Sequence, residues 1–476
     1  MNRRQFLSCS ALTTAGCVSS TGPDGVVLND VHSASNRTRV SRVSRFQKLN
    51  DATWTAGQPC IAMGSRHAMG GQQFLSDGHV IDTRAMRGGF ELDSERGLLR
   101  ARAGTEWPEV IAFLTRTRGE DGAPRWSVRQ KQTGADALTL GGAISANIHG
   151  RGLRLRPFLH DVEDFTLRVA DGSVLRCSPD ENRELFRLAG GGYGLLGVIG
   201  DVTLQLEPHR WLRRRVKLQH ADGLMAAFQR RMAEGFLYGD WQFAIDPTSD
   251  DFLQLGVFSC YEPAPAPSEA ERKARGPKLR SDDWQRLITL AHTDKKKGFE
   301  TYSRYYLGTD GRVYSSATFQ MSQYTPGYHE KIGPGSEMIT EIYVPRHRLA
   351  DFLRAAAATL RKSHADVVYG TVRLIEKDDL SVLAWAREPW ACTIFNLHVP
   401  VDGVGRAAAE DNFRALIDLA IECGGSYYLT YHRWATREQV LACHPRLPEF
   451  LRRKEKHDPR GQFQSDWFRH HQRLLG

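Results

Sequence analysis

Gly64-Ser65-Arg66-His67-Ala68-Met69-Gly70-Gly71 is the most informative segment of the chain. It follows the apolar stretch Ile61-Ala62-Met63 and precedes a strand-like run that ends at Asp82. Glycine allows the backbone to turn its N–H groups inward and to approach a ligand closely. A concave row of such N–H groups binds anions, and a diphosphate above all. The segment therefore predicts a diphosphate-binding loop in which His67 can reach whatever the diphosphate carries.

Two further glycine-rich motifs lie downstream. Residues 139–152 read Thr-Leu-Gly-Gly-Ala-Ile-Ser-Ala-Asn-Ile-His-Gly-Arg-Gly, and residues 190–200 read Gly-Gly-Gly-Tyr-Gly-Leu-Leu-Gly-Val-Ile-Gly. A Rossmann dinucleotide site requires Gly-x-Gly-x-x-Gly directly after a strand and at the start of a helix. The motif at 190–200 instead follows an expected helix and leads into an expected strand. We therefore exclude a nicotinamide site of the Rossmann type.

Length and composition are those of a globular protein of two or three domains, with 476 residues, 41% of them hydrophobic, and a net charge of +9. No apolar run reaches the roughly 18 residues that a membrane-spanning helix needs. We find no spacing typical of a metal site and no nucleic-acid-binding motif, so neither a metal nor nucleic acid is expected. Arginines cluster at 151–156 and 213–215. They indicate a solvated basic surface or, alternatively, an anionic substrate or membrane headgroups.

The N-terminus resembles an export signal and not a part of the fold. Asn2-Arg3-Arg4-Gln5-Phe6-Leu7 is similar to a twin-arginine signal, and Thr14-Ala15-Gly16-Cys17 is similar to the cleavage box of a lipoprotein. We expect residues 1–17 to be a signal, Cys17 to carry a lipid, and the protein to be periplasmic or membrane-anchored in a bacterium. A chance Arg-Arg pair at a cytoplasmic N-terminus is the alternative. Residues 18–37 are predicted to be a flexible linker.

Hydrophobic periodicity divides the remaining chain into three parts. Residues 38–208 are glycine-rich and predict short strands, with a hairpin at 165–177 around an Asp-Gly turn. Residues 209–430 predict two strand–helix–strand units, with one helix over 349–360, and an exposed loop over 261–283. We expect an α+β protein whose cap domain has an antiparallel sheet with helices on one face.

The three glycine motifs, in this order, resemble the flavin-binding domain of the vanillyl-alcohol-oxidase family, which is also called the PCMH-type fold. The resemblance implies an FAD-binding domain over 38–208, a cap domain over 209–430, and a C-terminal segment, 431–476, that returns to the first domain. The first loop would hold the FAD diphosphate, the second motif would line the ribityl chain and the isoalloxazine, and the third would end beside the flavin. The cofactor-binding residues implied in this way are Ala62, Met63, Gly64, Ser65, Arg66, His67, Ala68, Met69, Gly70, Gly71, Gln72, Gly134, Thr139, Leu140, Gly141, Gly142, Ala146, Asn147, Ile148, His149, Ile199 and Tyr428.

His67 has a more specific implied role. Gly64-Ser65-Arg66-His67 is similar to the loop of alditol and aldonolactone oxidases, in which the equivalent histidine carries an 8α covalent bond to the flavin. A neutral imidazole beside the dimethylbenzene edge can attack the activated methyl carbon of the flavin. The bond then raises the flavin potential and prevents loss of the cofactor. The resemblance therefore implies FAD bound covalently through His67, and the alternative is a histidine that only hydrogen-bonds the loop.

The C-terminal half resembles a second branch of the family, decaprenylphosphoryl-ribose oxidase, over residues 424–433. Tyr428 matches the tyrosine of the Tyr-x-x-Lys strand in that branch, whereas Tyr431 stands in place of the lysine. Arg151 also replaces a lysine of that branch. The alditol-oxidase cap instead uses Glu-x-Arg, and the comparable stretch here, which ends at Arg373, lacks the glutamate. The substrate of neither branch can therefore be assigned directly to this chain.

Oxidation of a hydroxyl-bearing carbon by hydride transfer to flavin N5 needs a group that takes the hydroxyl proton. The candidates for catalysis are three bases or orienting groups and two arginines that polarise substrate oxygens: His149, Tyr431, His432, Arg151 and Arg373. Asn396 and His398 lie on one face of one strand and either line the pocket or form a satisfied polar pair.

The sequence thus predicts an exported, FAD-dependent oxidoreductase of a sugar, polyol or aldonolactone CH–OH group. Oxygen or a membrane electron carrier would reoxidise the flavin. Two alternatives stay open. The first is a lipid-linked sugar oxidase of the decaprenylphosphoryl-ribose oxidase type, and the second is a flavin- or sugar-binding module that has lost catalysis.

Overall fold

A computed structural model describes residues 25–30, 37–119, 122–273, 279–321 and 335–476. The predicted signal, residues 1–17, and its Cys17 lipid site lie outside the described residues. Part of the predicted linker forms a strand, because β1 (Val26–Leu28) pairs antiparallel with β2 (Thr38–Val40). The prediction of a flexible tether is wrong for this part. In the described chain, no helix combines the length and the apolar character needed to cross a bilayer.

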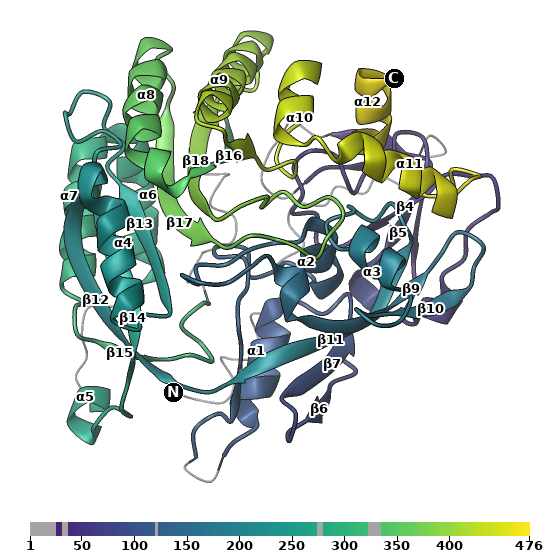
Figure 1. The fold of residues 1–476 in the computed structure, drawn as a ribbon, viewed down its shortest axis with the longest axis horizontal. Helices are drawn as coiled ribbons and strands as arrows, with labels where there is room; N and C mark the ends of the chain where they lie inside the picture. Colours follow the sequence, from purple (N-terminus) through teal and green to yellow (C-terminus); the bar gives the residue numbers. More distant parts are fainter. Residues whose placement is uncertain (1–24, 31–36, 120–121, 274–278, 322–334) are drawn as a thin grey trace.

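Beside the β1–β2 pair, the first domain contains two larger sheets (Figure 1). Three parallel strands have the order β3-β5-β4, with bounds Arg42–Arg45, His79–Asp82 and Cys60–Met63. The six-stranded sheet has the order β10-β9-β11-β7-β6, with β8 paired to β11, over Val174–Cys177, Val162–Arg168, Val198–Pro208, Leu98–Arg102, Glu91–Asp93 and Trp126–Val128. The helices of this domain are α1 (Trp107–Arg116), α2 (Leu140–Ala146) and α3 (Arg183–Ala189). The hairpin expected at 165–177 is β9–β10, and the Asp171 carboxylate stabilises its turn by accepting the Ser173 N–H at 2.8 Å.

The second domain is built on one antiparallel sheet of eight strands in the order β15-β12-β14-β13-β17-β18-β16-β19. In that order the strands cover Val313–Ser315, Trp211–His220, Leu255–Ala264, Tyr238–Phe243, Val367–Ile375, Trp390–Val399, Ser336–Pro345 and Ser426–Tyr427. Helices α4 (Leu224–Ala233), α8 (Leu349–Lys362) and α9 (Gly403–Glu422) cover one face, where Phe228 of α4 packs on Phe258 and Phe352 of α8 packs on Phe395. The predicted α+β class is therefore confirmed.

Two more helices lie on the opposite face of this sheet, toward the first domain. They are α6 (Ser281–Thr293) and α7 (Lys295–Leu307), and Leu287 and Tyr306 from them line a cavity together with residues of the sheet. The prediction of an exposed loop over 261–283 is only partly right, because β14 continues to Ala264 and the short helix α5 (Glu269–Lys273) follows.

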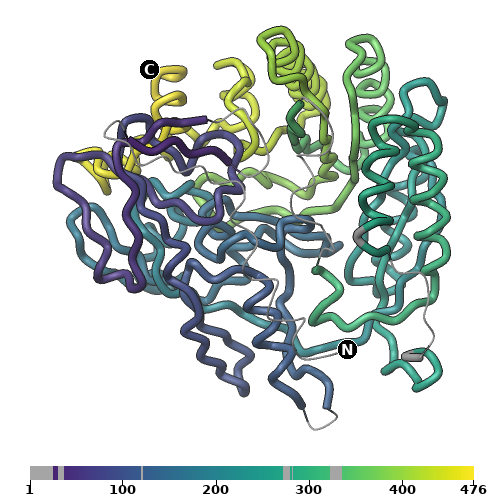
Figure 2. The backbone as a smooth tube through the Cα atoms, turned by 180° about the vertical axis from the view of Figure 1, so that it is seen from behind, coloured from purple at the N-terminus to yellow at the C-terminus, as the bar shows by residue number. Residues whose placement is uncertain are grey.

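The C-terminal segment lies against the first domain (Figure 2). It contains α10 (Arg437–Cys443), α11 (Leu447–His457) and α12 (Asp466–Leu475). The N–H of Cys60 on β4 donates to Gln462 O at 2.7 Å, and the Ser76 N–H donates to the Asp466 carboxylate at 2.8 Å. These bonds join the end of the chain to the strand that leads into the Gly64 loop.

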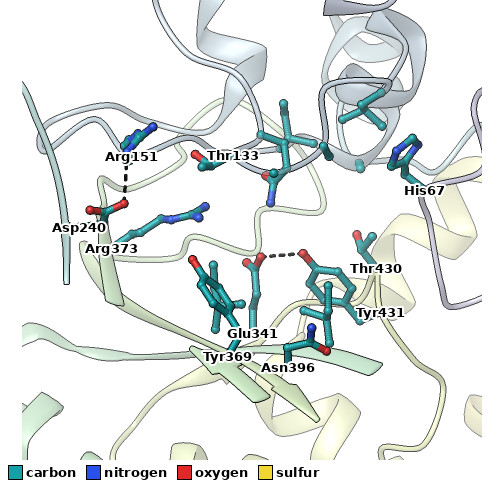
Figure 3. Close-up of a pocket in the computed structure, with 18 of the residues that line it drawn as sticks. His67, Thr133, Arg151, Asp240, Glu341, Tyr369, Arg373, Asn396, Thr430 and Tyr431 are labelled. Atoms are coloured by element: carbon teal, nitrogen blue, oxygen red, sulfur yellow. Dashed lines mark hydrogen bonds and ion pairs between the residues drawn. The ribbon is translucent and has the colours of Figure 1, made fainter. Parts of the chain in front are cut away.

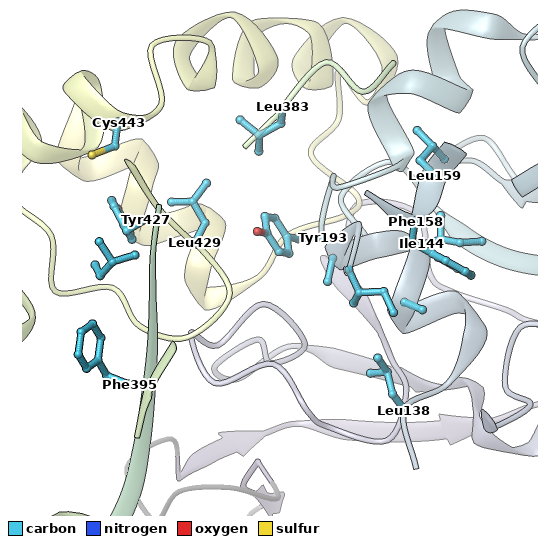
Figure 4. Packing of buried hydrophobic residues seen from close by; sticks show 14 of the residues in the cluster. Leu138, Ile144, Phe158, Leu159, Tyr193, Leu383, Phe395, Tyr427, Leu429 and Cys443 are labelled. Atoms are coloured by element: carbon cyan, nitrogen blue, oxygen red, sulfur yellow. The ribbon is translucent and has the colours of Figure 1, made fainter. Parts of the chain in front are cut away.

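One buried apolar cluster runs through both domains (Figure 4). Ile144 and Leu159 contribute from the first domain, and Phe395 and Tyr427 contribute from the cap. Because the two domains share one core, the walls of the cavity between them are held in a defined relation. The cysteines of the described chain are all free thiols, and no disulfide joins any two of them there.

Candidate functional site

A cavity of about 860 Å³ lies between the two domains. One wall contains the three glycine motifs, and the other contains the inner face of the cap sheet with α6 and α7. The lining includes most of the residues implied as cofactor-binding: Ala62, Gly64, Ser65, Arg66, His67, Ala68, Gln72, Gly134, Thr139, Gly141, Gly142, Ala146, Ile148, Ile199 and Tyr428. Segments that are far apart in the sequence thus face a single space (Figure 3).

The first half of the Gly64–Gly71 loop faces this cavity. Ser65 Oγ donates to Glu106 Oε1 at 2.7 Å, which anchors the loop to the start of α1. A Cβ on Gly64 would collide with the hydroxyl of Thr139, so glycine is required where the first loop meets the second motif. His67 lines the cavity on the side opposite Arg151 (Figure 3).

The second half of the loop has another role. The N–H groups of Met69 and Gly70 donate to Thr430 O at 3.1 and 2.9 Å, and Gln72 Nε2 donates to Leu429 O at 2.8 Å. Met69, Gly70 and Gly71 are outside the lining, and Met63 is buried in the core. The expectation that the whole loop contacts a diphosphate is therefore wrong for these residues. Met69 and Gly70 instead hold the C-terminal segment against the cavity.

The second and third motifs contact each other through backbone hydrogen bonds. In α2 the N–H of Gly141 donates to Ala103 O at 2.8 Å, and the N–H of Gly142 donates to Thr139 Oγ1 at 3.3 Å. The N–H of Tyr193 in the third motif donates to Ser145 O at 2.8 Å. These N–H groups already donate to oxygen atoms of the protein, so they are not available to a ligand. The glycines here instead allow the backbone segments to approach each other closely.

Three residues that were implied as cofactor contacts contact other parts of the protein instead. Leu140 is fully buried in the core. Asn147 caps α2 with a left-handed backbone, and its side chain donates to the Asp378 carboxylate at 2.9 Å and accepts the Leu159 N–H at 2.8 Å. His149 lies behind the lining, buried against Glu341. For these residues a direct contact with the cofactor is not what the structure provides.

Glu341 is the functional residue that sequence reasoning missed. It lies on β16 and lines the cavity, and its carboxylate accepts Tyr431 OH at 2.7 Å, His149 Nε2 at 2.8 Å and Tyr343 OH at 3.0 Å. Both ring nitrogens of His149 face oxygen atoms, since Nδ1 lies 3.1 Å from the carbonyl oxygen of Gly150. The available signal was a glutamate that directly precedes the apolar run Ile342-Tyr343-Val344 of a strand.

The electrostatics around Glu341 assign protonation states. Burial alone would raise the pKa of the Glu341 carboxyl, but the charge of His149 and the hydrogen bonds from His149 and Tyr431 outweigh it and lower the pKa to about 2. Burial and the Glu341 charge raise the pKa of Tyr431 well above its usual value. Tyr431 therefore keeps its proton at neutral pH and donates it to Glu341. Tyr431, which the sequence predicts as a base or an orienting group, is therefore a neutral hydroxyl that donates a hydrogen bond to the Glu341 carboxylate.

Glu341 also places a glutamate beside Arg373, whose own strand lacks the glutamate of the Glu-x-Arg motif. Strands β16 and β17 both pair with β18, and Glu341 and Arg373 project from the same face of the sheet into the cavity (Figure 3). A glutamate and an arginine thus meet there from two different strands, whereas the resemblance placed them on one strand.

His432 does not belong to the cavity. Its ring stacks on Phe413, Tyr427 and Trp434, and Nε2 lies 3.3 Å from Thr340 Oγ1 on the helix-covered face of the sheet. Burial lowers the pKa of His432 to about 3, so the ring is neutral. The prediction that His432 is a catalytic base is therefore wrong: the chain leaves β19 after Tyr427 and turns, and consecutive side chains then face different ways.

The remaining predicted residues divide between the cavity and its edge. Arg151, Arg373 and Asn396 line the cavity, whereas His398 pairs with Glu337 at 2.9 Å, with its Nδ1 facing the carboxylate. Arg151 Nη1 lies 3.4 Å from Asp240 Oδ2. Trp385 and Trp390 are buried.

Comparison with known proteins agrees with this geometry. Residues 39–178 match the family described as the FAD binding domain. Over 168 residues the chain is 31% identical to cytokinin dehydrogenase 8 of Oryza sativa, which covers 32% of this chain and 30% of that protein. It is 41% identical to L-gulonolactone oxidase of Mus musculus over 134 residues, 28% of either chain. These matches span about a third of the relatives' length.

A longer match extends into the cap. The chain is 23% identical over 443 residues to L-gulono-1,4-lactone dehydrogenase of Mycobacterium tuberculosis, covering 88% of this chain and 91% of that protein. The matched family domain contains the first two glycine motifs, whose residues line the cavity. The chain therefore carries an FAD-binding domain over residues 39–178, and over most of its length it is similar to an aldonolactone dehydrogenase.

Proposed function

We propose that this protein is an FAD-dependent oxidoreductase that oxidises a CH–OH group of a sugar, polyol or aldonolactone. One observation carries the proposal: the three glycine motifs and the Glu341–Tyr431 pair face the same cavity of about 860 Å³. Such a volume is within the range of cofactor and ligand sites, and the lining combines aromatic walls with a few convergent polar groups. The full-length similarity to a gulonolactone dehydrogenase supports the choice of donor class.

The lining fits FAD in shape and in chemistry. Gly64–Ala68 and the segment from Thr139 to Ile148 would hold the cofactor, because glycine at 64 and 141 lets separate backbone segments come together beside the cavity. FAD supplies the acceptor for a hydride removed from carbon. We further propose that His67 forms the covalent bond to the flavin, because its side chain belongs to the lining within the same loop.

The chain's own residues provide the proton chemistry. Tyr431 Oη can accept the hydroxyl proton of a donor while its own proton passes to Glu341 Oε1, 2.7 Å away. The charge of His149 keeps Glu341 ionised, and Arg373 adds to this effect. Tyr431 and Glu341 are 8% and 0% exposed, so bulk water is excluded from this exchange. Arg373 would orient the donor oxygens on the other side of the carboxylate.

The test is anaerobic reduction of the flavin by a panel of aldonolactones, polyols and sugars. We expect bleaching by at least one class, and we expect the substitution Tyr431→Phe to slow bleaching by about 100-fold or more while flavin content is kept. Reoxidation by air with formation of hydrogen peroxide would identify oxygen as acceptor, and a need for a quinone would identify a membrane carrier. A fully flavinated protein that no donor bleaches would refute the proposal. Export through the N-terminal signal is a separate proposal, tested by fractionation of the native host.

A further inference from the structure

The end of the cavity farthest from His67 is rich in arginine. Arg151, Arg214 and Arg373 all line it, and they are 9%, 7% and 3% exposed. Arginine keeps its charge in proteins, so three guanidinium groups are held here with little access to bulk water. Burying a charge without a partner is costly, and such a charge is retained where it meets a ligand of opposite sign or a functional need.

The carboxylates nearby do not balance these charges. Asp240 lies 3.4 Å from Arg151, whereas Glu341 already accepts three hydrogen bonds from other side chains. Within the described chain, neither Arg214 nor Arg373 has a carboxylate within ion-pair distance. Buried N–H groups of all three arginines, namely the Nε of each and Nη1 of Arg373, also lack a protein acceptor there.

Arg214 is held in place by aromatic rings. Its guanidinium carbon lies 5.1, 4.7 and 5.3 Å from the ring centres of Tyr261, Tyr306 and Tyr314, and Nη1 donates to Thr309 Oγ1 at 3.1 Å. Arg151 lies over the same Tyr261 ring at 5.6 Å. Two cations share one aromatic ring, an arrangement that orders the guanidinium groups without neutralising them. Burial raises the pKa of Tyr306 to about 12, so its hydroxyl stays protonated and can donate to an anion.

We propose that this end of the cavity is an oxyanion subsite, and that the physiological donor carries a carboxylate or phosphate group which Arg214, Arg151 and Arg373 bind. The proposal rests on the function proposed above and specifies its donor as an anionic one. The anion is not the diphosphate of FAD, because His67 and its loop lie across the cavity from Arg151 and Arg373 (Figure 3). Guanidinium groups bind carboxylate and phosphate with paired N–H donors, which gives orientation as well as affinity.

The test uses the flavin-loaded protein and two independent readouts. The first is the thermal shift and the flavin spectral change on titration with inorganic phosphate and with acetate. The second is the ratio of kcat/KM for matched donors: a sugar, the same sugar with a terminal phosphate, and the corresponding sugar acid. We expect saturable anion binding and a preference for one charged donor of about tenfold or more, and the preferred donor identifies phosphate or carboxylate as the bound group.

The variant Arg214→Gln should weaken anion binding and reduce the charged-to-neutral ratio at least tenfold. The matched control is Arg215→Gln, which removes the same charge from the next position of β12, where the side chain is partly exposed and pairs with Glu262 at 2.7 Å. The control should change neither readout by more than twofold. If Arg214→Gln does not fold, Arg373→Gln should produce the same loss.

Three results would overturn the inference. The first is oxidation of neutral donors with no anion binding, which would leave the proposed function standing. The second is equal weakening of anion binding by Arg214→Gln and Arg215→Gln. The third is loss of flavin, and not of anion selectivity, from the Arg214 variant. If no donor of either charge bleaches the flavin, the proposed function fails, and the phosphate and acetate titrations still decide whether the subsite exists.

Discussion

The substitution Glu341→Gln keeps the shape of the buried side chain and removes its charge. The carboxylate accepts hydrogen bonds from Tyr431, His149 and Tyr343 at 2.7, 2.8 and 3.0 Å. A glutamine has one acceptor oxygen and an NH₂ group, so at least one of the three donors loses its acceptor and the others lose charge assistance. At about 1 kcal/mol for each of the two weakened bonds and about 1–3 kcal/mol for a buried donor without an acceptor, the expected cost is about 3–5 kcal/mol.

The matched control is Glu337→Gln. Glu337 lies four residues earlier on β16, faces the same side and is also buried, with 4% exposure against 0% for Glu341. Burial raises the pKa of the Glu337 carboxyl, whereas the pKa of Glu341 is lowered. The charge of Glu337 therefore destabilises the folded state. The substitution Glu337→Gln should lower the free energy of unfolding by at most about 1 kcal/mol. Denaturant unfolding of the flavin-loaded variants measures both values.

The stability difference between the wild type and Glu341→Gln should also depend on pH. The pKa of Glu341 is about 2 in the folded protein, below its ordinary value of 4.5. The stability that it contributes is therefore present above about pH 4.5 and is lost as the pH falls toward 2. The gap between wild type and Glu341→Gln should narrow over this window. A gap below 1 kcal/mol at neutral pH, or equal costs at 337 and 341, would refute the reasoning.

Further predictions concern the loop, the cavity wall and the buried imidazole. The substitution His67→Ala should move the flavin from the acid-precipitated protein to the supernatant, and colour that stays with the variant precipitate would exclude the covalent bond through this residue. Gly64→Ala should weaken FAD binding about tenfold or more, because the new methyl group meets Thr139. Gly403→Ala, whose Cβ would meet nothing within 4 Å, should bind FAD like the wild type in the same titration. His432→Phe should keep turnover within threefold and improve stability in acid, because a ring with a pKa of about 3 opposes folding as the pH falls from about 6.5; a large loss of turnover would return His432 to the site.

Much of the fold was predictable because it rests on local patterns. Leu349, Phe352, Leu353, Ala356 and Leu360 repeat with helical spacing, and all of them are buried in α8. The Asp-Gly turn predicts its hairpin for an equally local reason. Glycines at close contacts likewise leave a signal in the sequence, and the resemblance of the three motifs to a flavin-binding domain implied that these separate segments share one site.

The chemistry of the site was less predictable because it depends on contacts across the fold. Glu341 meets His149 over 192 residues of sequence, and no local pattern records that pairing. Arg214 was visible only as one of three consecutive arginines, and strand alternation decides that it alone of the three is buried against the cavity. His432 was wrongly predicted to belong to the site because it is adjacent to Tyr431 in the sequence. The turn after β19 separates the two side chains.

We propose that three distant glycine motifs form a single FAD cradle. The flavin content of the purified protein tests this cradle, with the flavin released by denaturation or proteolysis, identified by chromatography and divided by the protein concentration. We expect one FAD per chain, and a Gly64→Ala preparation that is markedly depleted under the same conditions. A colourless protein that takes up no FAD when the cofactor is supplied in excess would contradict it.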